Sequence, residues 1–281
     1  MDKTLEFLNE KLTVIVVGFD DYVDVWNHCF DLMNRFWKDR PRTILVDSEL
    51  NPSYDKVDVI NAGSEAEWSK KSKKALGEVS TEYILLLLED FFISKPVDNK
   101  RILKAIELMD ADQLDYYQVL IQLSNQSWAK GKSYKGDKHI RIIPSDKKYP
   151  INLQAAIWRK DFFEKCLGDG NYNTWKFEMD HMYDVVNIDK INCVLDNSNI
   201  LNIIHSVVQS KYLRSSVKAL RKIGCIIHEN ERPILSRKDD FKYNLKLFMY
   251  GIIPKTMHSY AKKIGKIINI DFVTDRLSRD K

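Results

Sequence analysis

The sequence predicts an α/β protein whose mostly parallel central sheet is flanked by helices, as in a Rossmann-like fold. Two observations support this prediction. Strand-like runs such as "TVIVVGF" and "YILLLL" are apolar at consecutive positions, which is typical of strands buried on both faces. The segments follow one another in the order strand, helix, strand, strand, helix, strand, and this order is typical of parallel sheets.

The elements can be placed in order along the first half of the chain. Strands are predicted at 13–19, 42–49, 55–61, 83–88 and 115–123, and helices at 21–38, 65–78 and 98–110. In the first helix, apolar residues from Val23 to Trp37 recur at spacings of three and four, and Asp20 is placed as its N-cap.

The second half is less regular. Residues 124–150 are polar and read as an irregular excursion that contains the strand-like "HIRIIP". A strand is predicted at 151–158, short helices at 159–167 and 174–187, the second capped by Thr174, and a loop between them. From residue 212 onward the pattern is helical and basic, with interruptions at Pro233 and Pro254.

Composition excludes several classes of protein. The chain has 281 residues, of which 44% are hydrophobic and 30% charged, which is typical of a globular protein and not of a disordered one. No apolar run approaches the length of a membrane span, and the N-terminus is a poor match to a signal peptide. Its four cysteines are scattered along the chain, so we expect reduced thiols in a cytoplasmic protein.

The charge is concentrated at one end of the chain. Residues 231–281 hold 12 Lys and Arg against 6 Asp and Glu, although the whole chain has a net charge of only +4. This asymmetry suggests an anionic partner, either membrane lipid or nucleic acid. Within the tail, 241–270 mixes apolar residues with lysines at helical spacing. Such a helix can lie on the inner face of the cell membrane, or it can pack on the rest of the protein.

Three of the predicted strands end in acidic residues. Asp20 follows the first strand, Asp47 the second, and Glu89 and Asp90 the leucine-rich strand. Ligands of open α/β sheets bind outside the carboxyl ends of the strands, and clustered carboxylates suit Mg²⁺ or Mn²⁺. Asp20 and Asp47 taken singly are equally explained as a helix cap and a turn residue. For Glu89 and Asp90 we favour a function, because burying carboxylates requires a compensating partner.

The order of "VIVVGFDDY", "ILVDS", "NAGSEAEWSKKSKKAL" and "TEYILLLLEDFFI" resembles nucleotide-sugar glycosyltransferases of the GT-A fold, especially family-two-like bacterial capsule and lipopolysaccharide enzymes. The resemblance covers about residues 12–210. It implies a catalytic domain at 1–210, with a donor half at about 12–123 and an acceptor half at about 151–210. Residues 211–281 would then form a helical, basic C-terminal extension.

The resemblance also implies where the donor lies. Phe19 and Asp20 would flank the nucleoside base of a nucleoside-diphosphate sugar, with a UDP-sugar favoured, and Asp47 would accept a hydrogen bond from its imide. Asn61 and Gly63 match the Asn-x-Gly segment of that family.

The metal-holding acid of the family matches Asp90, with Glu89 beside it. A divalent metal, Mn²⁺ or Mg²⁺, would be held by Asp90 and by His205, while Lys211 and Arg214 would contact the diphosphate. The family's second acid is missing from "LEDFF". Coordination by one acid, and catalysis without metal, therefore both remain open.

The segments "NLQAAIWRKDFFEKCL" and "NTWKFEMD" are similar to the acceptor side of those enzymes. Glu178 or Asp180 would be the carboxylate that deprotonates the acceptor hydroxyl. Trp158 and Trp175 would stack on a sugar face, although core positions explain two tryptophans equally well.

The resemblance thus implies a glycosyltransferase, with inversion favoured over retention, that acts on a glycan or polyprenyl-diphosphate-linked acceptor in bacterial surface polysaccharide synthesis. Two other classes remain. A metal-dependent nucleic-acid enzyme is disfavoured, and no nucleic acid is expected as a partner, because the basic excess avoids the acid-bearing half. A catalytically inactive GT-A-like binding module would retain the fold without transferring sugar.

Overall fold

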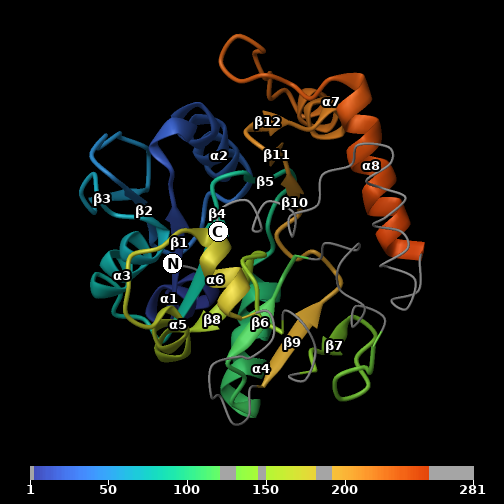
Figure 1. Ribbon diagram of the computed structural model, residues 1–281. Helices are drawn as coiled ribbons and strands as arrows, with labels where there is room; N and C mark the ends of the chain where they lie inside the picture. The colour runs from blue at the N-terminus through green and yellow to red at the C-terminus, as the bar shows by residue number, and fades with distance from the viewer. Residues whose placement is uncertain (1–2, 121–130, 145–149, 182–191, 253–281) are drawn as a thin grey trace.

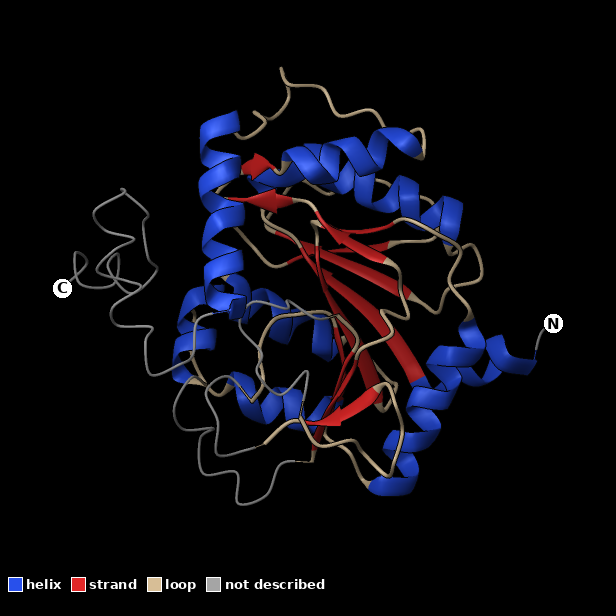
Figure 2. Ribbon diagram, turned by 90° about the vertical axis from the view of Figure 1, so that its right-hand side faces the viewer, coloured by secondary structure: helices blue, strands red, loops and turns tan. Residues whose placement is uncertain are grey.

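The computed structural model describes residues 3–120, 131–144, 150–181 and 192–252, with side chains described as far as residue 245. Within these ranges the protein is an α/β structure whose central sheet is covered by helices on both faces, which confirms the predicted fold class (Figures 1 and 2). The parts of our predictions that fall on 121–130, 145–149, 182–187 and 253–270 lie outside the described residues.

Eight strands form the central sheet. Their order is β3 (Asp58–Asn61), β2 (Thr43–Asp47), β1 (Leu12–Val17), β4 (Tyr83–Leu88), β8 (Ala156–Arg159), β6 (Tyr116–Gln118), β9 (Cys193–Asp196) and β7 (Ile140–Ile142). Strands β8 and β7 run antiparallel to their neighbours, and the other pairs are parallel. The apolar runs read from the sequence therefore form a mostly parallel sheet.

Alternate residues of the central strands face two hydrophobic clusters. Val14 and Val16 join a cluster with α1 (Lys3–Lys11), α2 (Val23–Phe36) and α4 (Asn99–Asp112). Ile15 and Val17 join the other, with α3 (Trp68–Gly77), α5 (Lys160–Leu167) and α6 (Thr174–Asp180). Since successive side chains of a strand point to opposite faces, these helix sets cover opposite faces of the sheet. We had not predicted helix α1.

The chain after residue 200 forms smaller elements beside α2. Strand β10 (Ile203–His205) pairs antiparallel with β5 (Phe91–Ile93), and β11 (Val207–Val208) forms a hairpin with β12 (Lys211–Tyr212). Helices α7 (Arg214–Lys222) and α8 (Arg237–Ile252) follow, with non-helical backbone between them. The prediction of helix from 212 onward was therefore wrong at 212–213 and over most of 223–236, where an interruption had been predicted only at Pro233.

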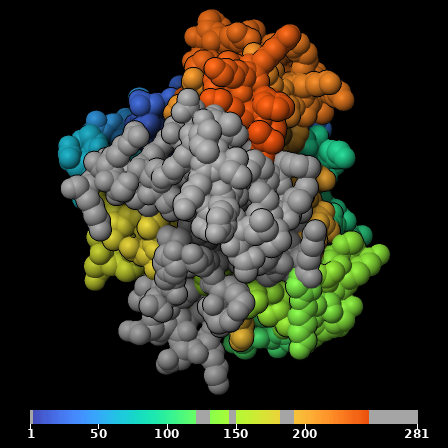
Figure 3. Space-filling view, turned by 45° about the vertical axis from the view of Figure 1, so that its right-hand side comes forward, coloured from blue at the N-terminus to red at the C-terminus, as the bar shows by residue number. Residues whose placement is uncertain are grey.

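Side chains from 212–227 share the cluster that contains α2. Tyr212, Leu220 and Ile227 are buried there together with Trp26 and Phe30. In the space-filling view the orange surface of this segment lies at one end of the molecule, next to the blue surface of the N-terminal part (Figure 3). A domain boundary near residue 210 stays a prediction.

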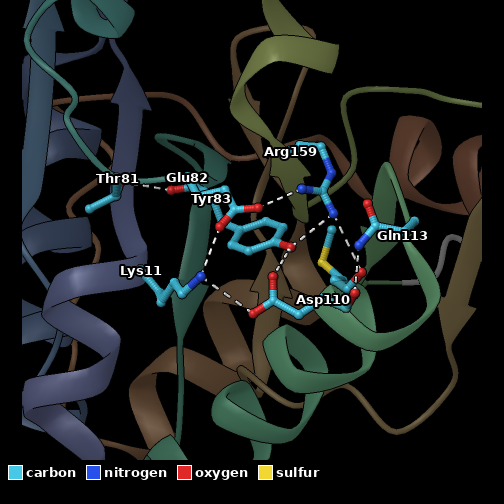
Figure 4. Close-up of polar contacts among 8 residues, drawn as sticks. Lys11, Thr81, Glu82, Tyr83, Asp110, Gln113 and Arg159 are labelled. Atoms are coloured by element: carbon cyan, nitrogen blue, oxygen red, sulfur yellow. Dashed lines mark hydrogen bonds and ion pairs between the residues drawn. The ribbon is translucent and has the colours of Figure 1, made fainter.

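The start of β4 is held by a separate charged network. Glu82 accepts hydrogen bonds from Lys11 at 2.8 Å and from Arg159 at 2.5 Å, and the Tyr83 hydroxyl donates to Asp110 at 2.6 Å (Figure 4). These groups satisfy one another and join α1, α4 and β8 to the amino end of the strand. The carboxylates at the other end of β4 have a different environment.

Two element boundaries were predicted incorrectly for local reasons. The strand predicted from residue 151 begins only at Ala156, because the Asn152 side chain accepts from the Gln154 amide at 2.9 Å and forms a turn. Helix α6 is capped by Asn173, whose side chain accepts from the Lys176 amide, and not by Thr174. Among the described residues, no helix combines the length and the apolarity that crossing a bilayer requires.

Candidate functional site

Carboxylates gather at one edge of the sheet because three neighbouring strands end at the same level. In the parallel register, Val17 of β1 lies opposite Val46 of β2 and Leu88 of β4. Asp47 and Glu89 directly follow the two partner residues, and Gly18 to Asp20 follow Val17. The predicted acids therefore lie at one edge, where open α/β sheets bind their ligands.

Asp20 ties the end of β1 to the loop after β2. Its carboxylate accepts from the Ser48 amide at 2.9 Å and from the Glu49 amide at 3.3 Å. It also faces the Lys71 ammonium at 3.2 Å. Partial burial acts to raise the pKa of Asp20, but these hydrogen bonds and the lysine charge outweigh it and lower the pKa below its usual value. The expected helix cap is not observed, because Tyr22 precedes α2 and no side chain caps it.

Lys71 is a site residue that we did not predict. It is 3% exposed, and its ammonium donates to the Gly18 carbonyl at 2.9 Å as well as to Asp20. A side chain at Gly18 would overlap Trp26, since a Cβ there would approach its ring to 2.6 Å. The sequence did contain a signal, because Lys71 lies on the same helix stripe as the buried residues Trp68 and Ala75.

Asp47 forms a closed turn and does not present its carboxylate to a ligand. It is fully buried and accepts from the Asn51 amide at 2.8 Å and from the Asn61 side chain at 2.5 Å. The expected direct contact with a nucleoside base, which the carboxylate does not offer in this arrangement, stays a prediction. Asn61 and Gly63 are exposed beside it, and Gly63 has a φ of +91°, which favours glycine. Phe19 is 55% exposed at the end of β1.

Asp90 and His205 meet across the β5–β10 pair. The pairing sets His205 opposite Phe91, and the Nε2 atom of His205 lies 2.8 Å from Oδ2 of Asp90. The Val207 amide donates to the same oxygen at 3.2 Å. Burial acts to lower the pKa of His205, but the charge and hydrogen bond of Asp90 raise it overall. The sequence prediction thus named two residues 115 positions apart that are in contact.

Glu89 lies beside this pair without a positive group bound to it among the described residues. Burial, and then the charge of Asp90, raise the pKa of Glu89 to about 8, although the charge of Lys71 acts in the opposite direction. Acidic side chains with such shifted pKa values are concentrated at functional sites.

Asp90 supplies a carboxylate of the kind that a divalent cation with phosphate ligands would need, and a metal at this position stays a prediction. In the described ranges no cluster of three or more His, Cys, Asp or Glu side chains forms a metal site. The Nε2 atom of His205 and the Val207 amide both contact Oδ2 of Asp90. Mg²⁺ binds commonly through one or two carboxylates together with substrate phosphates, and carboxylate ligands also suit Mn²⁺.

Glu178 lies one strand away from these carboxylates. Strands β4 and β8 are antiparallel, with Leu86 opposite Ala156. Glu89, which follows β4, therefore lies at the same end of this strand pair as Leu153, which precedes β8. The Leu153 amide donates to Oε1 of Glu178 at 3.4 Å. Burial raises the pKa of Glu178, and this hydrogen bond offsets only part of the effect.

The other acceptor-side candidates differ from one another in exposure. Asp180 forms an exposed ion pair with Lys176 at 2.9 Å on the outer face of α6. Trp175 is 55% exposed one turn before Glu178. Trp158 is completely buried against Tyr116, which favours the core position over stacking on a sugar, the two alternatives that the sequence left open.

Lys211 and Arg214 are exposed on the segment that follows His205. Two bonds tie this segment to the His205 strand: the Leu213 amide donates to the Ser206 carbonyl at 2.9 Å, and the Ser216 hydroxyl donates to the His205 carbonyl at 2.8 Å. The backbone of both cationic residues therefore lies near the strand of His205, as a contact with a diphosphate at the Asp90–His205 pair would require.

No known protein family matches this sequence, and no curated protein is significantly similar to it. Solved structures that match this one in part include TarS residues 1–349 from S. aureus, at 12% identity over 93% of this chain and 76% of that chain, with a TM-score of 0.44. A cytidylyltransferase from Leptospira borgpetersenii matches at 12% identity over 84% of this chain and 96% of that chain, with a TM-score of 0.45. Bifunctional IspDF from Campylobacter jejuni matches over 69% of this chain at 12% identity, with a TM-score of 0.39. The match spans only 52% of the IspDF chain.

Proposed function

We propose that this protein is a glycosyltransferase that moves a sugar from a nucleoside-diphosphate sugar, with a UDP-sugar favoured, to a hydroxyl group of a glycan or of a lipid-linked acceptor. The observation that supports this best is the Asp90–His205 pair at the carboxyl edge of the parallel strands. A single carboxylate and an imidazole next to exposed cations suit a metal-bound diphosphate.

Each candidate residue has a place in this proposal. Asp90 and His205 would hold the divalent cation, whose chemistry when bound is to neutralise charge on the leaving diphosphate. Lys211 and Arg214 would add positive charge on the same group. Phe19 offers an apolar surface for the nucleoside base at the end of β1.

Glu178 would act as the base of an inverting reaction. Its carboxylate takes the proton of the acceptor hydroxyl while the acceptor oxygen forms a bond to the anomeric carbon. The bond from that carbon to the phosphate oxygen breaks, and the nucleoside diphosphate leaves with the electron pair. Burial favours this role for Glu178 over the exposed and ion-paired Asp180, because a base works best when its pKa lies near the working pH.

A role in surface polysaccharide synthesis is part of the proposal, with an acceptor at the inner face of the cell membrane. The net positive charge of residues 231–281 supports this setting, because basic segments bind anionic lipid surfaces.

The first test is ligand binding followed by melting temperature. UDP-, GDP-, CMP- and dTDP-sugars are added with and without Mn²⁺, and a ligand that binds the folded state raises the melting temperature. We expect one donor class to do so, more strongly with Mn²⁺. No shift with any donor would refute the proposal.

Asp90→Asn is the matching variant for the metal site. It removes charge without changing volume, and we expect transfer to fall by about 10²–10³-fold, as for other electrostatic contacts in a transition state. Asp58→Asn, an exposed acid at the opposite edge of the sheet, is the control and should leave transfer unchanged. Equal turnover by wild type and Asp90→Asn would remove Asp90 from the site.

A further inference from the structure

A cluster of polar side chains is buried inside the sheet next to the acceptor side. Tyr116 and Gln118 of β6 are fully buried, and Asn152, just before β8, is 5% exposed. An amide buried without partners costs several kcal/mol on water-to-alkane transfer scales. Three such groups together in a central strand pair are therefore retained only if their hydrogen bonds are satisfied, and they call for an explanation beyond packing.

The three side chains bind one another. The Tyr116 hydroxyl lies 3.2 Å from Oε1 of Gln118 and 3.3 Å from the backbone carbonyl oxygen of Asn152. The side-chain amide of Asn152 donates through Nδ2 to the same Gln118 oxygen at 3.2 Å. The side-chain amide of Gln118 in turn donates through Nε2 to the Leu120 carbonyl at 2.5 Å. The orientation of the Asn152 side chain is fixed by these contacts, because each of its polar atoms has a partner.

The fixed side chain of Asn152 shapes the backbone that follows it. Its Oδ1 atom accepts from the Gln154 amide at 2.9 Å, which closes an Asx-type turn over residues 152–154. The amide in the middle of this turn, that of Leu153, is the one that donates to Glu178 at 3.4 Å. The buried cluster therefore contacts the turn that carries the hydrogen-bond donor of Glu178.

We propose that Tyr116, Gln118 and Asn152 are positioning residues for Glu178, acting through the turn at Leu153. This inference rests on the proposed function, in which Glu178 is the base. The cluster would hold the Leu153 amide in place, so that the carboxylate is oriented toward the acceptor hydroxyl. Misplacement of a catalytic group by about 1 Å can cost about 10²-fold in rate, so a rigid support has a measurable value.

The pKa of Glu178 depends on the charged and titratable groups around it and on the Leu153 hydrogen bond. Tyr116 faces it from β6, the Lys176–Asp180 pair lies on its helix, and His181 is the C-cap of that helix. His181 points its Nε2 to the Cys166 carbonyl at 3.1 Å. The Leu153 hydrogen bond lowers the pKa of Glu178 against the opposing effect of burial. Loosening the turn should therefore raise that pKa further.

The test compares two tyrosines in the same strand. Tyr116→Phe keeps the ring, which packs on Trp158, and removes the hydroxyl from the cluster. Tyr117→Phe is the matched control, because Tyr117 is also buried and donates to Asp196 at 2.9 Å in a contact unconnected to Glu178. Asn152→Ala removes the turn acceptor, and Asn152→Ser restores a weaker one.

The pKa of Glu178 is measured by NMR titration of the free protein, and kcat is measured against pH. We expect Tyr116→Phe and Asn152→Ala to raise the pKa of Glu178 and to lower kcat by about ten- to hundredfold, with donor affinity unchanged within about twofold. Asn152→Ser should recover part of the loss. Tyr117→Phe should leave the pKa and kcat unchanged even though it loses stability.

The possible outcomes separate this inference from the proposed function. An unchanged Glu178 pKa in both cluster variants would overturn the positioning role, whatever the enzyme does. An equal kcat loss in Tyr117→Phe would also overturn it, since the effect would then be general destabilisation. Failure of the wild type to bind or transfer any nucleotide sugar would refute the proposed function, while the NMR titration would still decide the coupling.

Discussion

The buried Lys71–Asp20 pair predicts an unequal response to mutation of its two members. The Lys71 side chain is 4% exposed and the Asp20 side chain 24% exposed. Removing one partner of a buried ion pair leaves the other charge uncompensated, which costs about 3–5 kcal/mol when that charge is fully buried. The free energy of unfolding should therefore fall more when the remaining charge is the lysine.

The magnitudes follow from what each residue keeps. After Lys71→Met, Asp20 still has amide hydrogen bonds from Ser48 and Glu49 as well as contact with water. The methionine fills the volume of the lysine stem, so we expect a loss of about 1–2 kcal/mol. After Asp20→Asn, the buried ammonium loses the carboxylate that it faces at 3.2 Å and keeps its bond to the Gly18 carbonyl, and we expect a loss of about 3 kcal/mol.

Urea unfolding at pH 7, followed by tryptophan fluorescence, measures both losses and that of the double variant. Because the two residues are in contact, the double variant should be more stable than the sum of the single losses implies, by about 1–2 kcal/mol. A larger loss for Lys71→Met than for Asp20→Asn, or strictly additive losses, would refute the reasoning.

Three further predictions concern activity. Burial raises the pKa of Glu178, so kcat should fall as the pH drops through that pKa, at a higher pH than the usual glutamate pKa near 4.3 would give. Glu178→Gln should remove this fall of kcat at low pH and should lower kcat by about 10²–10⁴-fold. Asp180→Asn should leave kcat nearly unchanged. Trp175→Ala should raise the KM of the acceptor by about 2–12-fold if the exposed indole stacks on a sugar, and an unchanged KM would exclude that contact. Deleting 241–281 should weaken sedimentation with anionic vesicles more than it weakens donor binding, since each basic residue at such a surface contributes about 1 kcal/mol, and equal vesicle binding would limit the tail to packing.

The strands could be predicted because their signal is local. Continuous apolar runs such as Tyr83–Leu88 occupy the centre of the sheet, and the acids that follow them lie at its carboxyl edge. The contact between Asp90 and His205 was expected from resemblance alone, since nothing local in the sequence brings them together. It depends on the pairing of β5 with β10, which is a tertiary contact.

The errors arise where a side chain has a tertiary partner. Asp20 has a local cap pattern, yet it binds the loop after β2. Lys71 lies in a lysine-rich helix that reads as solvated, and only its phase on the buried stripe distinguishes it from its neighbours. Trp158 follows "AAI" in a buried strand, so the pattern already favoured its burial, and only the resemblance kept a contact with a sugar as the alternative.

The pairing of β5 with β10 has a consequence for synthesis on the ribosome. Strand β5 ends at Ile93 and its partner ends at His205, 112 residues later. At about 5–20 residues per second, roughly 6–20 s pass between the emergence of the two strands. Throughout that interval the apolar edge of β5 has no neighbour on the β10 side, and unpaired strand edges promote aggregation. A slowly translated nascent chain of this protein is thus most exposed to misassociation at the strand that follows its two carboxylates.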